Sequence, residues 1–201
     1  MTSVLEELPN TYRAFFSKFT HITLVQKILI QPILSRRDVV LQAGTGTGKT
    51  EAILAPATER LLTCPEPFTI IYIVPTRALA LDMNRRIQFI YQQLGLKSGI
   101  RTGDGKTMRD SKPHLLILTP ESFDVLLGSQ NGENQYFLKH VRILIIDEVH
   151  MFLHQDRGYQ LAHLRHRLIR RAQGILQTIV LSATITDLAK AASFFSLKHV
   201  F

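Results

Sequence analysis

Short apolar segments alternate along this chain with longer segments in which apolar residues recur at the spacing of a helix. The short segments are rich in Val, Ile and Leu and predict strands at residues 39–43, 70–74, 115–118, 141–146 and 179–181. The longer segments predict helices at residues 49–62, 77–94, 158–172 and 187–195, and Pro120 is placed to open one more in its first turn. Alternating strands and helices are typical of an α/β domain, with a mainly parallel sheet sandwiched between helices.

Two other stretches, and the composition of one predicted strand, add to this pattern. Residues 1–30 predict a helical N-terminal cover, and residues 128–135 (GSQNGENQ) predict a loop because polar residues and glycine predominate. Residues 141–146 (VRILII) are apolar except for Arg142, a composition expected of a strand covered on both faces. No linker-like segment interrupts the alternation, so we expect residues 1–201 to form a single domain.

Composition narrows the classes of protein that fit. The 24 Lys and Arg exceed the 16 Asp and Glu, which gives a net charge of +8. Such an excess attracts phosphate backbones without specificity. Cys64 is the single cysteine, which excludes an internal disulfide framework and fits a reducing compartment. The sequence has neither a secretory signal pattern nor the run of ~20 apolar residues that spans a bilayer, so we expect a cytoplasmic protein with no membrane partner.

Residues 43–50 (AGTGTGKT) lie between the first predicted strand and its helix and match the phosphate-loop pattern, with Ala43 in place of the first glycine. Glycines let backbone N–H groups converge on one point, and the helix start adds partial positive charge. Lys49 can reach the β- and γ-phosphates, and Thr50 can bind Mg²⁺. A plain glycine-rich turn is the alternative. The predicted nucleotide-binding residues of the loop are Gly44, Thr45, Gly46, Thr47, Gly48, Lys49 and Thr50.

Two adjacent carboxylates follow the most apolar predicted strand. Because ligands of open parallel sheets bind beyond the carboxyl ends of the strands, Asp147 is expected near the phosphate loop, where it can hold Mg²⁺. Glu148 can orient and deprotonate an attacking water. Lys49, Asp147 and Glu148 are therefore the candidate catalytic residues, although a solvated turn is the alternative for an Asp-Glu pair. His150 follows the Asp-Glu pair closely in the sequence, and one interpretation of it is a packed histidine that caps a turn.

Several short motifs occur in a fixed order along the chain. They are the phosphate loop and residues 75–77 (PTR), 102–104 (TGD), 119–121 (TPE), 147–150 (DEVH) and 182–184 (SAT). Their order and spacing resemble motifs I, Ia, Ib, II and III of superfamily 2 (DEAD/DEAH-box) helicases. The resemblance extends from about residue 15 to residue 195, and it implies the first RecA-like, ATP-binding domain of such a helicase.

This resemblance implies roles for further residues. Phe19 and Gln26, with Thr23 just before the glutamine, resemble the Q-motif, in which the glutamine reads the adenine edge and so selects ATP. The residues that would contact a nucleic-acid backbone are Thr76, Arg77, Gly103, Thr119 and Pro120. Those that would couple the nucleotide and nucleic-acid sites are His150, Ser182 and Thr184. Ordinary turns and helix N-caps are the alternative reading of the threonines.

The resemblance is greatest to the large helicase-related branch, because the acidic motif ends in His150 and Arg157-Gly158 follow it. That branch implies a DNA strand rather than RNA as the nucleic-acid partner. A helicase of this superfamily also needs a second RecA-like domain, which supplies an arginine finger worth roughly 10³–10⁵ in rate in related phosphoryl transfer. We find no second such domain in residues 1–201, so we expect the isolated chain to hydrolyse ATP poorly.

Two other functions are compatible with parts of the sequence. A different P-loop enzyme, such as a GTPase or a small-molecule kinase, would leave residues 75–77 and 182–184 without a role, and the sequence has no guanine-reading NKxD or TKxD motif. A non-catalytic scaffold or nucleic-acid-binding module could retain the fold without its chemistry. The presence of Lys49, Thr50, Asp147 and Glu148 together argues against it.

Overall fold

A single parallel sheet forms the centre of the molecule in a computed structural model that describes residues 4–44, 46–101, 113–152, 156–183, 188–195 and 197. Its strands lie in the order β1-β6-β5-β2-β4-β3, and each neighbouring pair is parallel. The strand bounds are β1 Val39–Gln42, β2 Thr69–Ile73, β3 Ser98–Arg101, β4 Leu115–Leu118, β5 Val141–Ile146 and β6 Gln177–Ser182.

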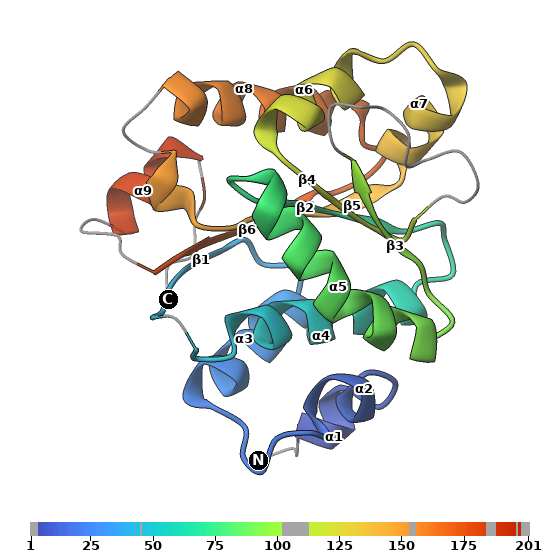
Figure 1. Ribbon diagram of the computed structural model, residues 1–201, viewed down its shortest axis with the longest axis vertical. Helices are drawn as coiled ribbons and strands as arrows, with labels where there is room; N and C mark the ends of the chain where they lie inside the picture. The colour runs from blue at the N-terminus through green and yellow to red at the C-terminus, as the bar shows by residue number, and fades with distance from the viewer. Residues whose placement is uncertain are drawn as a thin grey trace.

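Helices cover both faces of the sheet, which makes a three-layer sandwich (Figure 1). One layer contains α1 Val4–Glu7, α2 Tyr12–Phe16, α3 Leu24–Leu34, α4 Lys49–Thr63 and α5 Arg77–Gln93. The other contains α6 Pro120–Gly128, α7 Gly132–Lys139, α8 Asp156–Arg171 and α9 Leu188–Phe194, and a 3₁₀ turn, η1 Val149–Met151, follows β5. The fold is the α/β sandwich that the sequence pattern predicts, and it has the parallel sheet that the resemblance to a RecA-like domain implies.

Alternation of side chains along each strand builds two separate hydrophobic cores. In β5, Ile143 and Ile145 pack against the layer of α3 to α5, while Leu144 and Ile146 pack against the layer of α6 to α8. Successive residues of a strand point to opposite faces, so a strand covered twice needs apolar residues at every position. This requirement explains the unbroken apolar runs in the sequence.

Two elements differ from the sequence prediction. Strand β3 was not expected, because its four residues (SGIR) contain glycine and its burial is only partial at the sheet edge. Helix α7 begins inside the predicted loop at 128–135, because the Asn131 side chain accepts hydrogen bonds from the backbone N–H groups of Glu133 and Asn134. The polar residues and glycine at the start of α7 are therefore typical of a loop, although they begin a capped helix. Its later residues, Phe137 and Leu138, are buried.

The N-terminal helices are fastened to α4 by a buried carboxylate. Glu59 of α4 accepts hydrogen bonds from the backbone N–H groups of Asn10 and Thr11 and from the Thr11 hydroxyl. Helix α3 packs along α4, next to this attachment. Among the described residues, no helix is long and apolar enough to cross a membrane.

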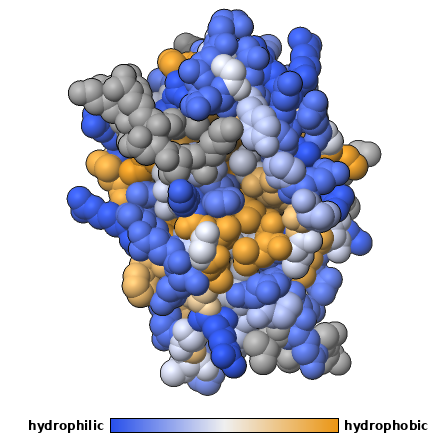
Figure 2. Space-filling view, turned by 90° about the vertical axis from the view of Figure 1, so that its right-hand side faces the viewer, coloured by the Kyte–Doolittle hydropathy of each residue, from blue (hydrophilic) through white to orange (hydrophobic). Residues whose placement is uncertain are grey.

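Strands β1 and β3 are the two edges of the sheet, and β3 lies on the right in Figure 1. Viewed from that side, the surface is mostly hydrophilic, with apolar residues gathered near its centre (Figure 2). The candidate functional residues lie elsewhere, along the carboxyl ends of the strands.

Candidate functional site

Parallel strands bring the predicted motifs to one edge of the sheet. The phosphate loop follows β1, residues 75–77 follow β2, residues 119–121 follow β4, and the acidic motif follows β5. Strand β6 lies between β1 and β5. The phosphate loop and the acidic motif are therefore separated by one strand, a gap of about 10 Å that long side chains can span.

The phosphate loop has the backbone conformation of an anion cradle. Gly46 and Gly48 have φ angles of +75° and +78°, in the left-handed region that glycine tolerates best. Gly48 is the N-cap of α4, and no side chain caps this helix. Because glycine has no side chain, the N-cap residue itself supplies no acceptor to the first-turn N–H groups, which suits an anion site. The Lys49 ammonium donates to the Ala43 carbonyl (2.8 Å), and the Thr47 hydroxyl donates to the Gly44 carbonyl (2.9 Å). Thr45 lies outside the described residues.

Asp147 is held in place from two sides. The Tyr72 hydroxyl donates to Asp147 Oδ2 (2.8 Å), and the Glu148 backbone N–H donates to Oδ1 (2.9 Å). Burial raises the pKa of the Asp147 carboxyl, and the Glu148 charge also raises it, while the Tyr72 hydrogen bond acts in the opposite direction. Burial likewise raises the pKa of Tyr72 well above its ordinary value, so the phenol stays protonated as a donor.

Glu148 is strained and incompletely satisfied. Its φ of +50° is left-handed, which costs roughly 1–3 kcal/mol for a residue other than glycine. Its Oε1 lies 4.0 Å from the Lys49 ammonium. Its Oε2 is buried, yet no group among the described residues forms a hydrogen bond with it. A buried polar atom without a partner is costly and is a mark of functional sites.

A cavity of about 220 Å³ joins these groups. Its polar lining comprises Gly46, Lys49, Thr50, Asp147 and Glu148, and its apolar lining comprises Val74, Pro75, Leu79 and Met83, with Arg86 at its border. The cation, the hydroxyl and the two carboxylates suit a Mg²⁺-bound polyphosphate, because Mg²⁺ prefers oxygen ligands and phosphate oxygens prefer N–H and ammonium donors. The residues present therefore fit MgATP.

The last residue of β6, Ser182, connects the phosphate loop with the acidic motif. The Nδ1 of His150 lies 3.1 Å from the hydroxyl of Ser182 and 3.3 Å from Glu148 Oε2. The Ala43 backbone N–H donates to the Ser182 carbonyl (3.1 Å). Ser182 thus contacts both motifs. Thr184 lies outside the described residues.

The residues that resemble the Q-motif contact the phosphate loop from α3. Thr23 caps α3 in a reciprocal capping box with Gln26, and its hydroxyl donates to the Thr47 carbonyl (3.0 Å). Gln26 is buried, and its Nε2 lies 3.5 Å from the Gly48 carbonyl. Phe19 is 42% exposed, with the Lys18 ammonium 4.9 Å from its ring centre. Gln26 is therefore in contact with the phosphate loop, whereas Phe19 lies at the surface.

The candidate nucleic-acid residues begin two neighbouring helices. The hydroxyl of Thr76 caps α5 and that of Thr119 caps α6, after the adjacent strands β2 and β4. Both threonines therefore cap helices, as the alternative interpretation expects. Thr76 is exposed and Thr119 is half-buried, so both can still be reached from solvent. Arg77 is exposed, while Pro120 is buried in the first turn of α6. Gly103 lies outside the described residues.

Two residues of this region were missed in the sequence. Tyr72 interrupts an aliphatic strand with a phenol, which was the available signal for a polar partner at Asp147. Arg157 donates to the Pro75 carbonyl (3.2 Å) and lies 2.7 Å from a carboxylate oxygen of Glu121. It therefore connects the loops after β2 and β4, and only the fold brings these segments together.

Comparison with known proteins agrees with this geometry. The DEAD/DEAH box helicase family matches residues 23–191. This chain belongs to the DEAD/DEAH box helicase family. The ATP-dependent rRNA helicase rrp3 of Schizosaccharomyces pombe is 30% identical to this helicase domain over 82% of the chain. The ATP-dependent helicase Lhr-Core protein 2 of Thermococcus barophilus is 31% identical over 95%.

A solved structure shows the same arrangement in three dimensions. The helicase Lhr of Mycobacterium smegmatis, bound to single-stranded DNA and AMP-PNP, superposes with a TM-score of 0.84 and 29% identity over 99% of this helicase domain. The chain covers 28% of that structure, 35% of rrp3 and 25% of the Lhr-Core protein. The relatives are therefore several times longer, and they include helicases named for RNA as well as one bound to DNA.

Proposed function

We propose that this domain binds ATP with Mg²⁺ and hydrolyses it to drive translocation or unwinding along a nucleic-acid strand. The observation that carries the proposal is the single cavity at which Lys49, Thr50, Asp147 and Glu148 meet, at the carboxyl edge of a parallel sheet. Family membership supports the same conclusion. The strained backbone of Glu148 and its buried Oε2, which accepts no hydrogen bond from the described residues, also support a functional role.

In this proposal the phosphate loop positions the triphosphate. The backbone N–H groups of Gly44 to Thr50 surround the phosphates, and Lys49 exchanges the Ala43 carbonyl for phosphate oxygens. Thr50 and Asp147 hold Mg²⁺, which when bound offsets the negative charge of the phosphates. Gln26, with Phe19 nearby in sequence, favours adenine over other bases.

Glu148 acts as the general base. Its Oε2 accepts no hydrogen bond from the described residues, with His150 Nδ1 3.3 Å away, so it has capacity left to orient a water molecule and accept its proton. Lys49 lies 4.0 Å from Oε1 and helps to hold the carboxylate in place by charge attraction. His150 and Ser182, with Thr184, respond to changes at Glu148 and transmit them to the neighbouring strand.

We further propose that Thr76, Arg77, Gly103, Thr119 and Pro120 follow the backbone of the bound strand. Helix starts and loop N–H groups contact phosphates without reading sequence. DNA is favoured over RNA as the strand, because the DEVH motif and the high similarity to an Lhr structure with bound DNA both support it. Residues 1–201 act as a first RecA-like domain, with residues 1–30 as its cover, and work with a second such domain.

The test combines nucleotide binding and hydrolysis. We expect MgATP to raise the melting temperature of the 201-residue chain, and a protein that also supplies the second RecA-like domain to show ATPase activity stimulated by single-stranded DNA. Glu148→Gln should retain binding and lose the activity, whereas Glu133→Gln, on the exposed start of α7, should change neither. A chain that MgATP does not stabilise would favour the scaffold function instead.

A further inference from the structure

The amino ends of the strands form the edge of the sheet opposite the nucleotide site, and basic residues gather there. Arg36 precedes β1, Arg60 lies in the last turn of α4 before β2, and Lys139 and Arg142 flank the start of β5. Arg170 and Arg171 end α8 before β6. Parallel pairing places all these segments along one edge. We call the six residues the basal basic surface: Arg36, Arg60, Lys139, Arg142, Arg170 and Arg171.

Two adjoining cavities open on this surface. The first, of about 320 Å³, is lined by Arg36, Arg60 and Arg142 together with Cys64, Phe68 and neighbouring residues. The second, of about 390 Å³, is lined by Lys139, Arg170 and Arg171 and by the amides of Gln130, Gln135 and Gln173. Gln173 borders both cavities. The cationic groups and amides therefore form a continuous series of donors.

Two of the three guanidinium groups of the first cavity are held by the protein. Arg142 donates to the Lys139 carbonyl (2.9 Å), and its side chain lies against Gly174, where an added Cβ would be 3.4 Å from Arg142 Nε. Arg60 donates to Gln177 and lies over the Phe68 ring. Fixed donors bind an anion without first losing rotamer freedom.

Charge on the basal basic surface is poorly balanced. The linings of the two cavities contain one carboxylate, Glu66, which is 73% exposed and 3.7 Å from Arg142. Within the described part of the chain, no carboxylate lies within ion-pair distance of Lys139, Arg170 or Arg171. Burial lowers the pKa of Arg60 to about 10, and the charge of Arg36 adds to this effect. An anion between these groups would relieve their repulsion.

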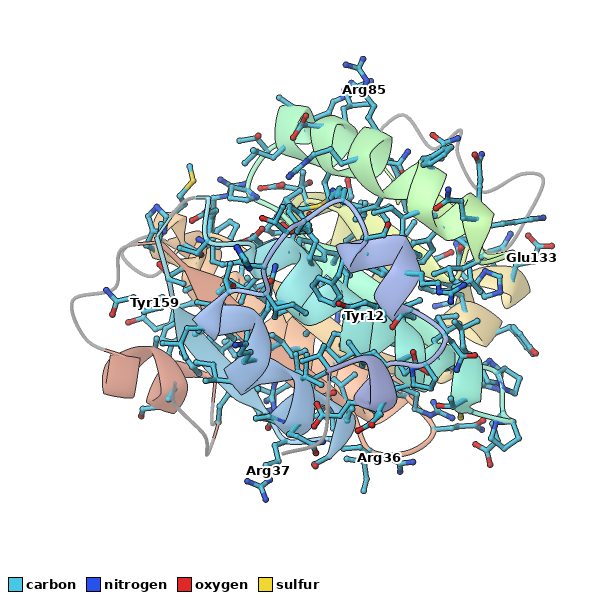
Figure 3. The ribbon with its side chains drawn as sticks, turned by 90° about the horizontal axis from the view of Figure 1, so that it is seen from below. Tyr12, Arg36, Arg37, Arg85, Glu133 and Tyr159 are labelled. Carbon is cyan, nitrogen blue, oxygen red and sulfur yellow. The ribbon has the colours of Figure 1, made fainter. Side chains whose placement is uncertain are left out.

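We propose that the basal basic surface binds the phosphate backbone of a nucleic-acid strand, at a site separate from the nucleotide cavity and from the loops after β2 and β4. Adjoining cavities, each with three cations, suit successive phosphates of a chain better than a single anion. Guanidinium, ammonium and amide donors are the groups that contact phosphates without reading bases. Arg36 points to the side opposite Arg85 of α5 (Figure 3).

The experiment measures binding of a labelled single-stranded oligonucleotide by fluorescence anisotropy across a range of salt concentrations, with no nucleotide present. The triple variant Lys139→Glu, Arg170→Glu, Arg171→Glu should bind at least about tenfold more weakly, and the slope of log K against log salt should become shallower by about 2, because each phosphate contact to a single strand contributes about 0.7. Omitting ATP makes the result independent of the proposed hydrolysis.

A matched control separates the site from net charge. Arg13→Glu, Lys27→Glu and Arg85→Glu change the same number of charges at exposed helix positions outside both cavities of the basal basic surface. This control should bind as the original chain does, and both variants should keep its melting temperature and its stabilisation by MgATP. Equal losses of oligonucleotide affinity in the two triple variants would overturn the proposal. An unchanged salt slope in the variant of Lys139, Arg170 and Arg171 would also overturn it.

A competition experiment distinguishes a binding site for a nucleic-acid strand from a binding site for a small anion. Longer oligonucleotides should bind the basal basic surface more tightly, and millimolar inorganic phosphate should displace them no better than chloride of equal ionic strength. Displacement by phosphate at low concentration, without dependence on strand length, would identify a site for one phosphate group. That result would contradict a nucleic-acid surface.

Discussion

At the scale of single residues, the acidic site stores unfavourable interactions that its chemistry requires. Asp147 is buried beside another carboxylate, and Glu148 has a left-handed backbone. Neither arrangement helps the folded state by itself. Both place oxygens where a metal-bound phosphate would need them, which is how functional sites exchange stability for activity.

We expect Asp147→Asn to abolish ATP hydrolysis while raising the melting temperature at neutral pH. A carboxyl whose pKa is raised on folding stabilises the protein at low pH, and this stabilisation is lost as pH rises through the folded-state pKa. Asparagine does not ionise, so the variant does not lose stability in this way as pH rises. Its side-chain carbonyl can still accept the Tyr72 hydrogen bond. Thermal unfolding from pH 4 to pH 8 should show the advantage of the variant increasing with pH.

Asp82→Asn is the control for this experiment. Asp82 is exposed and pairs with Arg86 on the surface of α5, so its substitution should leave the pH dependence of unfolding unchanged. If Asp147→Asn melted below the original chain at pH 8, the burial argument would be wrong.

Gly48 is a second residue at which a small change should have large effects. Alanine there would keep a φ of +78° and place its Cβ 2.4 Å from Gln26 Nε2. We expect Gly48→Ala to destabilise the fold by roughly 1–3 kcal/mol and to weaken ATP binding. Denaturant unfolding and nucleotide titration measure both effects.

Gly128→Ala is the matched control, because an added Cβ meets nothing within 4 Å there and the φ is ordinary. Combining Gly48→Ala with Gln26→Ala should recover the part of the loss due to contact, while the backbone strain remains. Full recovery in the double variant would show that the backbone conformation is unimportant.

The sequence contained the site residues themselves but not their mutual contacts. The types and spacing of Lys49, Asp147 and Glu148 indicated their chemistry, because metal and phosphate binding demand those groups. The hydrogen bond from Tyr72 and the bridge by Arg157 join residues 75 and 82 positions apart in sequence. Such contacts depend on strand order, which local patterns do not encode.

At the scale of elements, the starts of helices were the features that the sequence predicted best. Thr76 and Thr119 cap α5 and α6 as their positions before helical patterns indicate. Arg165 is different: it lies among several other basic residues of α8, yet it is buried and its Nε donates to the Thr178 hydroxyl. Periodicity identifies a helix, but it does not say which arginine finds an internal partner.

The attachment of the N-terminal helices to α4 allows a prediction at this scale. Glu59→Ala would leave the backbone N–H groups of Asn10 and Thr11 without their acceptor. We expect a loss of roughly 1–3 kcal/mol in the free energy of unfolding, the range for buried donors left unpaired. Limited proteolysis should also cut the first 20 or so residues earlier, since unpaired backbone opens more readily.

Asp82→Ala serves as the comparison, because a surface ion pair contributes at most about 1 kcal/mol. Equal protease resistance of the Glu59→Ala variant and the original chain would mean that apolar packing alone, without Glu59, holds the cover.

At the scale of the whole molecule, the parallel sheet separates two chemically distinct edges. The carboxyl edge combines carboxylates with a lysine, and the charged residues that line the cavities of the amino edge are cationic except for Glu66. The alternating pattern predicted a parallel sheet, and hence that the motifs share one edge. The position of β6 between β1 and β5 was not predictable, because it follows from long-range pairing.

Ligand binding should stabilise the whole domain. MgATP at one hundred times its dissociation constant should add about 2.7 kcal/mol to the free energy of unfolding. For a domain of this size we expect a rise of roughly 5–10 °C in melting temperature. Lys49→Ala should remove the shift, whereas Lys97→Ala, at an exposed position before β3, should keep it. A shift that persists in Lys49→Ala would place the nucleotide elsewhere.

Cys64 has a practical consequence. It is the chain's single cysteine, a partly exposed free thiol beside Arg60 in the first cavity of the basal basic surface. A maleimide fluorophore should therefore attach at one known point of the unaltered sequence. Its emission would report on events at the amino edge of the sheet, and energy transfer to a fluorescent ATP analogue would measure the distance between the two edges in solution.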